Sequence, residues 1–340
     1  MTDLMTTTFP GADIRNCGSS PDGEDILQAT IANGGSRATF MTWGASLQDF
    51  RREGVDHSLV LGSPDPAAYF GPMLYFGAIV GPVANRVAKG RFELNGKTYS
   101  LDRNEAGATT LHGGSKGFGQ VNWTLAECSA TSCSFAYRHA DGTCGFPGNI
   151  DVRVRYTLED DGALLIEIEG QSDALTHFAP AFHGYWNLDG TADVTGHGLT
   201  VPAETYLPVD DMLIPLGAPA PVAGTVFDYR VPKAPDAGLD HNFCLYGARS
   251  HDLCEMCRLE AGALRLTVES TEPGLQVYAG VGLDTAPFEG NNGKPYGRLA
   301  GVAIEPQTWP DTANHPKYPS SLLQPGETYR QVSRFRVTGI

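Results

Sequence analysis

Short stretches in which apolar and polar residues alternate, each ended by a turn signal, are the feature that most restricts what this chain can fold into. Apolar residues occupy every second position over 152–158, an acidic turn ending in glycine follows at 159–162, and the alternation resumes over 164–168. A period of two is that of a strand with one buried face. The segment therefore predicts a β-hairpin.

Other segments support the same fold class. The stretches 264–268 and 275–279 alternate in the same way on either side of a turn at 272–274. Helical periodicity is weak, and its best stretch is 24–32. The 340 residues include 41 glycines and 23 prolines, an excess over the average of roughly 12% that suits many tight turns. Further strand-like runs are Thr39–Phe50, Trp123–Tyr137, Arg298–Thr308 and Tyr329–Val337.

These patterns predict an all-β fold, specifically a large antiparallel β-sandwich. The acidic, proline-rich segment 202–235 keeps apolar residues such as Tyr206 and Phe227 and contains no run of serine or glycine. We therefore expect an ordered surface excursion there rather than a linker. No internal repeat is found, and we predict a single domain over residues 1–340.

Charge and cysteine content limit the partners and the compartment. The chain has 24 basic and 39 acidic residues, a formal net charge of −15, which argues against nucleic acid or an anionic membrane as a partner. No segment approaches the roughly 18 apolar residues of a membrane span, and Met1–Pro10 lacks the features of a secretory signal. The seven cysteines predict reduced thiols and a cytoplasmic protein. Cys254 and Cys257 have metal or redox spacing, but no second pair accompanies them.

Two segments carry candidate ligand-binding residues near the middle of the first half. Asn85 and Arg86 lie between small apolar residues, where the guanidinium is either a rigid donor to substrate oxygens or part of a surface ion pair. The glycine-rich segment 111–119 lacks the residue order of a phosphate-binding loop. His112 within it is either at the rim of a ligand site or structural.

Two later segments carry candidate acid–base groups. On an extended chain, His183, Tyr185 and Asn187 share one face, and Trp186 belongs to the core. Glu305 follows small apolar residues and precedes Pro306, which suits either a rigidly held base or the cap of an exposed strand end. Metal-ligand patterns such as HxH or HExxH are absent, as is the GxSxG nucleophile motif. The residue types therefore indicate acid–base chemistry on a small polyhydroxylated ligand.

Together these segments resemble the aldose 1-epimerases, or galactose mutarotases, over roughly residues 35–338. The resemblance implies the galactose mutarotase-like supersandwich, an open cleft, a small-molecule sugar substrate, and neither metal nor organic cofactor. It is carried by VANRVAKGRFELNGKTYSL (83–101), LHGGSKGFGQVNW (111–123), HGYWNL (183–188), GLDHNFCL (238–245), PGLQVYAG (273–280), IEPQTWPDTANHP (304–316) and LQPGETY (323–329).

The resemblance also implies roles for single residues. Glu305 matches the family's general base and His183 its general acid, which together open and reclose the sugar ring so that α and β anomers interconvert. For this chemistry the acid must be protonated near neutral pH, which a neighbouring negative charge would favour. The residues that match sugar-holding positions are Asn85, Arg86, His112, Asp240 and Gln276, and Tyr185 is a further candidate because it is in phase with His183.

This chain also departs from the family pattern. Pro82 stands where an arginine is frequent, and Ala181-Phe182 stands where Thr-Asn precedes the acid. Gly184 replaces a common serine, so polar side chains are missing next to His183.

Two alternative functions remain open from the sequence. An epimerase of hexose 6-phosphates would need basic residues at the cleft, for which Lys116 and Arg91 are available. A non-catalytic sugar-binding or regulatory protein should lack the acid or the base, and both are present. The expected oligomeric state is a monomer or a homodimer.

Overall fold

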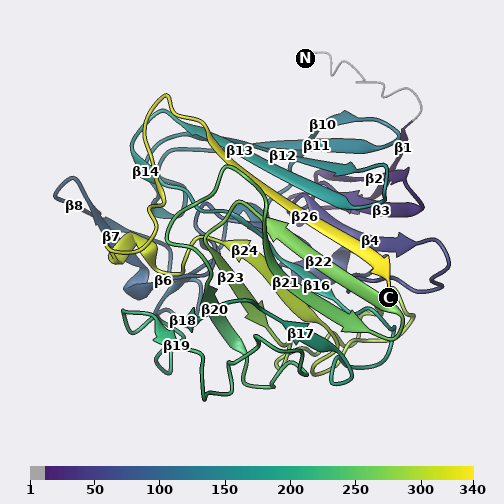
Figure 1. Ribbon diagram of the computed structural model, residues 1–340. Helices are drawn as coiled ribbons and strands as arrows, with labels where there is room; N and C mark the ends of the chain where they lie inside the picture. The colour runs from purple at the N-terminus through teal and green to yellow at the C-terminus, as the bar shows by residue number, and fades with distance from the viewer. Residues whose placement is uncertain (1–11) are drawn as a thin grey trace, which may run out of the picture.

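A computed structural model of the chain describes residues 12–340. Residues 1–11, drawn in grey in Figure 1, lie outside that description, and so does the expectation for Met1–Pro10. The paired strands are antiparallel, and the helical elements within 12–340 are short 3-10 turns, so the predicted all-β fold is confirmed. The turns are η1 (Pro66–Phe70), η2 (Ala88–Gly90), η3 (Phe118–Gln120), η4 (Thr143–Gly145) and η5 (Thr312–Asn314).

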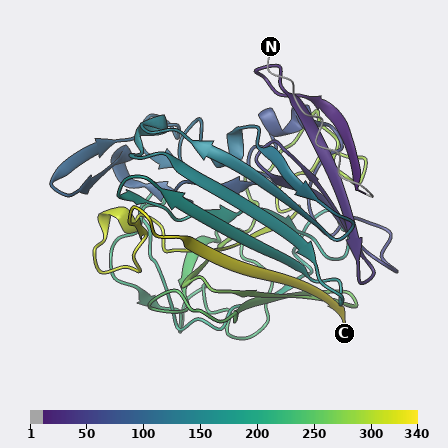
Figure 2. The ribbon, with the colours of Figure 1, turned by 90° about the horizontal axis from the view of Figure 1, so that it is seen from above.

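An eight-stranded sheet forms one layer of the molecule, and Figure 2 shows its long C-terminal strand in yellow beside the teal strands. In spatial order its strands are β10 (Thr124–Cys128), β11 (Ser132–His139), β12 (Ile150–Leu158), β13 (Leu164–Ser172), β26 (Tyr329–Gly339), β22 (Leu264–Ser270), β21 (Cys254–Ala261) and β17 (Gly198–Thr200). The predicted hairpin is β12 and β13, in which Leu158 lies opposite Leu164. Burial alternates along β12 as the sequence pattern requires.

Two further sheets and several short strand pairs complete the fold. The N-terminal sheet contains β1 (Asp13–Ser19), β2 (Asp25–Asn33), β3 (Ser36–Met41) and β4 (Ser46–Arg52). The six-stranded sheet has the order β16 (Gly184–Trp186), β24 (Val302–Gln307), β23 (Gly274–Tyr278), β20 (Asp240–Cys244), β18 (Thr205–Tyr206) and β19 (Ala220–Pro221). The short pairs are β14 (Thr176–His177) with β25 (Leu322–Leu323), β15 (Ala181–Phe182) with β5 (Ile79–Val80), β6 (Arg86–Val87) with β9 (Thr110–Leu111), and β7 (Arg91–Leu94) with β8 (Lys97–Ser100).

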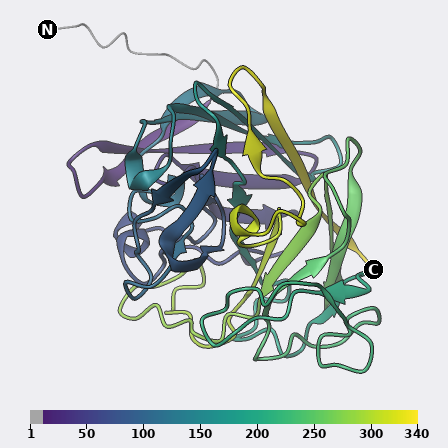
Figure 3. The same cartoon turned by 90° about the vertical axis from the view of Figure 1, so that its left-hand side faces the viewer.

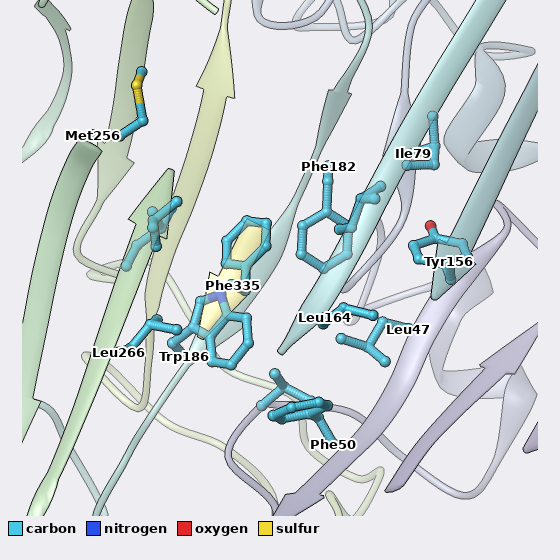
Figure 4. Close-up of a cluster of buried hydrophobic side chains, with 14 of the residues drawn as sticks. Leu47, Phe50, Ile79, Tyr156, Leu164, Phe182, Trp186, Met256, Leu266 and Phe335 are labelled. Atoms are coloured by element: carbon cyan, nitrogen blue, oxygen red, sulfur yellow. The ribbon is translucent and has the colours of Figure 1, made fainter. Parts of the chain in front are cut away.

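The core lies where these sheets face one another, and Figure 4 shows part of it. Trp186 is fully buried, as predicted, and its indole stacks on Phe335 with ring centroids 5.3 Å apart. Phe50 of the N-terminal sheet meets the same indole edge-on at 5.8 Å. Side chains from all three large sheets therefore share one apolar cluster, whose burial is the main stabilising contribution to folding.

One sequence expectation needs correction. The segment 24–32, the best helical candidate, is almost entirely strand β2, which pairs with both β1 and β3 and contains the β-branched residues Ile26, Thr30 and Ile31. The turn at 272–274 does not join two strands of one sheet. It carries the chain from β22 in the eight-stranded sheet to β23 in the six-stranded sheet.

The segment 202–235 is an ordered excursion, as expected, and its green loops lie at the bottom of Figure 3. It contributes the short strands β18 and β19 and buries Leu207, Val222 and Tyr229 almost completely. None of the helical elements in residues 12–340 is long and apolar enough to cross a membrane.

Candidate active site

A cavity of about 500 Å³ opens where β6, β9, β16, β20 and β24 come together. Seven of the eight predicted site residues line it: Asn85, Arg86, His112, His183, Tyr185, Asp240 and Glu305. The eighth, Gln276, lies directly opposite Glu305 on the neighbouring strand β23. The lining also includes Tyr75, Leu111, Leu213, Ala237, Gly238, Leu239, Tyr278 and Val281, which the sequence analysis did not select.

Strand pairing brings His183 and Glu305 together. Strand β16 starts directly after His183 and pairs with β24, so that Gly184 lies opposite Ile304 and the two polar side chains face the cavity. Nε2 of His183 lies 3.7 Å from Oε1 of Glu305, and the two side chains are 8% and 3% exposed. Glu305 is therefore a buried residue within its strand and not the cap of an exposed strand end.

Burial decides the protonation of this pair. It lowers the pKa of His183 to about 4, because an imidazolium loses hydration there. Burial first, and then the charge of Asp240, raise the pKa of Glu305 well above its usual range, while Arg86 opposes that rise. Burial thus disfavours the charged form of both groups, which favours a neutral His183 and a protonated Glu305. A carboxyl group does lie beside His183, but desolvation is the largest influence on the pKa of His183 and lowers it.

Two hydrogen bonds join Asn85 and His112, one between their backbones and one from the Asn85 backbone to the His112 ring. The pairing of β6 with β9 places them side by side, and the backbone N–H of His112 donates to the carbonyl of Asn85 at 3.0 Å. In return, the N–H of Asn85 donates to Nδ1 of His112 at 3.1 Å. A backbone amide can only donate there, so Nδ1 is an acceptor and the neutral ring carries its proton on Nε2. Burial, His183 and Arg86 all lower the pKa of His112 well below its usual value.

Arg86 forms an ion pair and also lines the cavity. Its Nε and Nη2 donate to the carboxylate of Glu105 at 2.8–3.2 Å, and Thr109 Oγ1 donates to the same carboxylate at 2.6 Å. The remaining nitrogen, Nη1, lies 3.9 Å from Asp240. The guanidinium is therefore fixed from behind, with one edge available to a ligand. Sequence reasoning missed Glu105, because its contact with Arg86 depends on how the chain folds back.

Asp240 and Gln276 form a second polar unit. Nε2 of Gln276 donates to Oδ1 of Asp240 at 2.5 Å. Desolvation raises the pKa of Asp240, and Arg86 and Gln276 counteract this effect. The structure thus places the Gln276 amide against Asp240 rather than in the cavity wall.

The shared face expected for residues 183–187 extends to Tyr185 but not to Asn187. Tyr185 lines the cavity with its ring centroid 5.1 Å from that of His183. The amide of Asn187 donates instead to the carbonyls of Thr191 and Ala300, because β16 ends at Trp186 and the chain turns away.

The residues next to His183 that depart from the family pattern, Phe182 and Gly184, pack in the core and not in the cavity. Phe182 is 2% exposed, and its ring lies 5.4 Å from that of Phe335. A Cβ atom added to Gly184 would lie 2.4 Å from the phenyl ring of Phe182. The large side chain at 182 and the missing one at 184 are thus a linked change in packing, and His183 and Tyr185 point to the other side.

Backbone strain gathers around the cavity. Positive φ values are uncommon for residues other than glycine and cost free energy, so they persist mainly where function requires them. Four residues of the lining have this conformation, namely Tyr75 (70°), Asn85 (60°), His112 (52°) and Leu213 (59°). In addition, Oε2 of Glu305 and Nδ1 of His183 are buried without a hydrogen-bond partner among the described residues. Both features are typical of a functional site.

One cluster in residues 12–340 has the composition of a metal site. Ligand atoms of His112, His183 and Glu305 lie within 4.8 Å of one another. A metal-bound imidazole, however, normally donates its other N–H to an acceptor. His112 has the opposite arrangement, since its Nδ1 accepts from Asn85. The residues therefore fit a hydrogen-bonding site better than a metal centre.

Comparisons with known proteins agree on one family. The family model described as "Aldose 1-epimerase" matches residues 28–336. Human galactose mutarotase is 39% identical over 88% of this chain and 90% of its own length. An aldose 1-epimerase of Haemophilus influenzae is 35% identical over 94% of this chain and 97% of its own length. The crystal structure of an aldose epimerase homologue from C. elegans superposes with a TM-score of 0.85 at 29% identity, covering 92% of this chain and 98% of that one.

Proposed function

We propose that Glu305 and His183 are the catalytic base and acid of this chain, which belongs to the aldose 1-epimerase family and is an isomerase that interconverts the α and β anomers of aldoses. The observation that carries the proposal is the 3.7 Å separation of their reactive atoms in one cavity. Two groups that exchange a proton must both reach the sugar, and their common cavity makes this possible.

The proposed reaction needs two proton transfers. Glu305 takes the proton of the anomeric hydroxyl while His183 gives a proton to the ring oxygen, and the C1–O5 bond breaks. The free aldehyde rotates about the C1–C2 bond. The ring then closes from either side of the aldehyde, with Glu305 returning its proton to O1 and His183 taking the proton from O5.

The directions of the two pKa shifts fit this cycle. Ring opening leaves Glu305 protonated and His183 neutral, which is the state that burial favours. To begin from the cyclic sugar, the proton moves from Glu305 to His183. Sugar hydroxyls that donate to the carboxylate favour this transfer, as does the positive charge of Arg86, which lowers the pKa of Glu305.

The remaining polar residues would hold the sugar. The cavity lining offers the sugar hydrogen-bond donors, acceptors and an aromatic surface, from Asn85, Arg86, His112, Asp240 and Tyr185. Because Nδ1 of His112 accepts the N–H of Asn85, the Nε2–H of His112 is available as a donor to the sugar. Gln276 would act by fixing Asp240.

Free aldoses fit the cavity better than hexose 6-phosphates. Arg86 is the basic side chain among the lining residues, and its charge is already paired with Glu105. Lys116 and Arg91, the cations that a phosphate would need, are exposed and lie outside the lining. A non-catalytic sugar-binding role finds no support, since the acid and the base lie together.

We also propose a cytoplasmic location, supported by seven free cysteines. A single domain is supported by the apolar cluster that contains residues from Ala29 to Val337. Monomer or homodimer remains the prediction for assembly, and light scattering checks it.

Polarimetry of freshly dissolved α-D-galactose, α-D-glucose and L-arabinose tests the function and ranks the substrates. We expect acceleration to the normal equilibrium rotation, and at least a hundredfold slower catalysis by Glu305→Gln. The thermal midpoint of that variant should stay within a few degrees of the wild type. Retention of most activity would overturn the assignment of the base.

A further inference from the structure

Tyr75 lies in the cavity wall beside both histidines. Its ring centroid is 4.7 Å from that of His112 and 6.3 Å from that of His183, with the latter pair of rings stacked. Its φ of 70° is unusual for an aromatic residue. The fold therefore holds this side chain in place against a backbone preference.

The phenolic oxygen of Tyr75 accepts hydrogen bonds from two side-chain amides. Nε2 of Gln120 donates to it at 2.8 Å and Nδ2 of Asn104 at 3.4 Å. The same Gln120 nitrogen also donates to the carbonyl of Gly114. Asn104 accepts the N–H of Leu111 through Oδ1 and donates to its carbonyl through Nδ2. Since a carbonyl can only accept and a backbone N–H only donate, the orientation of both amides is fixed.

The phenolic proton is consequently left over. A hydroxyl has one proton and two acceptor sites, and the amides of Gln120 and Asn104 use the acceptor sites. Among residues 12–340, the hydrogen bonds of the Tyr75 hydroxyl are all of this accepting kind. Burial raises the pKa of Tyr75 to about 12, so the proton stays in place at neutral pH.

We propose that Tyr75 is a substrate-contact residue that donates its phenolic hydrogen bond to one hydroxyl of the bound aldose and so contributes to the choice among aldoses. The inference rests on the proposed function of the cavity. A donor held in one direction rewards a sugar with a hydroxyl at that position, and a sugar without that hydroxyl leaves the donor unpaired.

The test combines Tyr75→Phe with monodeoxy aldoses. Phenylalanine keeps the ring beside His112 and His183 and removes the donor. We expect kcat/KM for the best aldose to fall by about threefold to tenfold, mainly through KM, with an unchanged pH profile. For one deoxy sugar the substitution should have no effect, because that sugar lacks the partner hydroxyl.

Tyr99→Phe is the matched control, because Tyr99 lies on β8 outside the cavity lining. It should leave kcat/KM unchanged for every sugar. Gln120→Leu gives a second variant that keeps the phenol but removes one amide holding it, and we expect a smaller loss with the same sugar preference.

The outcomes separate this inference from the proposed function. An equal loss for the parent aldose and for every deoxy aldose, or no loss at all, would overturn the role of Tyr75. If Tyr75→Phe fails to fold, equal effects of Gln120→Leu on all sugars would overturn it as well. If the wild type accelerates no aldose, the proposed function fails instead.

Discussion

Nε2 of His183 and Oε1 of Glu305 lie 3.7 Å apart, and burial shifts the pKa values of these two groups in opposite directions. For such a pair the titration belongs to both groups together. In the proposed mechanism the catalytically competent form of the pair carries one proton. It is lost when a second proton binds at low pH or when the single proton leaves at high pH.

The activity of the enzyme should therefore persist in unusually acidic solution. Addition of the second proton charges His183, whose pKa is about 4, so we expect kcat/KM to fall only below about that pH. The alkaline limb should lie well above the usual pKa of a glutamate. Initial polarimetric rates, corrected for the spontaneous reaction and for any loss of fold, check this profile. An acid limb centred near 6.5 would contradict it.

Glu105 should matter for sugar binding although it does not line the cavity. Its carboxylate accepts hydrogen bonds from Nε and Nη2 of Arg86. Glu105→Gln weakens this paired interaction, which orients the remaining nitrogen, Nη1, toward the cavity. We expect a loss of about tenfold in kcat/KM, with KM affected more than kcat. Glu127→Gln is the control, because Glu127 forms solvent-exposed ion pairs with Arg153 and Arg155 of the eight-stranded sheet. A change in kcat alone would argue against positioning of Arg86.

Chelators should leave the activity intact. His112 presents a protonated Nε2 to the cavity because Asn85 occupies Nδ1, and a protonated nitrogen does not ligate a metal. Prolonged incubation with EDTA followed by polarimetry gives the measurement. Inactivation that a divalent ion reverses would show that the cluster with His183 and Glu305 holds a metal after all.

Gly184→Ala should destabilise the fold through Phe182. The new methyl group would lie 2.4 Å from a buried phenyl ring, and displacing that ring costs about 1–3 kcal/mol. Adding Phe182→Leu makes room, so the double variant should lose less than the sum of the single losses. Urea unfolding measures these free energies, with Gly196→Ala as the control because nothing lies within 4 Å of its added Cβ. Strict additivity would contradict the linkage.

Local pattern was sufficient for the strongly alternating strands, and together with the family resemblance it selected the chemical groups of the site. Alternation in 152–158 predicts β12, since a half-buried strand displays its period directly. The same information failed for 24–32, where the pairing partners β1 and β3 decided the conformation. His183 and Glu305 could be selected from residue type and family resemblance, whereas their separation depends on the pairing of β16 with β24.

Residues that support the site were harder to predict. Tyr75 and Glu105 carry no motif of their own, and their positions follow from contacts with Gln120 and Arg86 over 45 and 19 residues of sequence. Asn187 was misplaced because the end of β16 is set by the turn that follows, which a period-two extrapolation ignores.

The positive φ angles around the cavity have a practical meaning for making this enzyme more heat-resistant. Glycine at exposed Ala106, whose φ is 50°, relieves strain away from the lining and is a safe place to engineer. The same replacement at Asn85 relaxes a similar angle but deletes a side chain of the cavity wall. Asn85→Gly also removes the hydrogen bond that Oδ1 of Asn85 accepts from the N–H of Arg86. Screens for heat tolerance should therefore measure sugar turnover together with unfolding whenever a strained residue of the lining is changed.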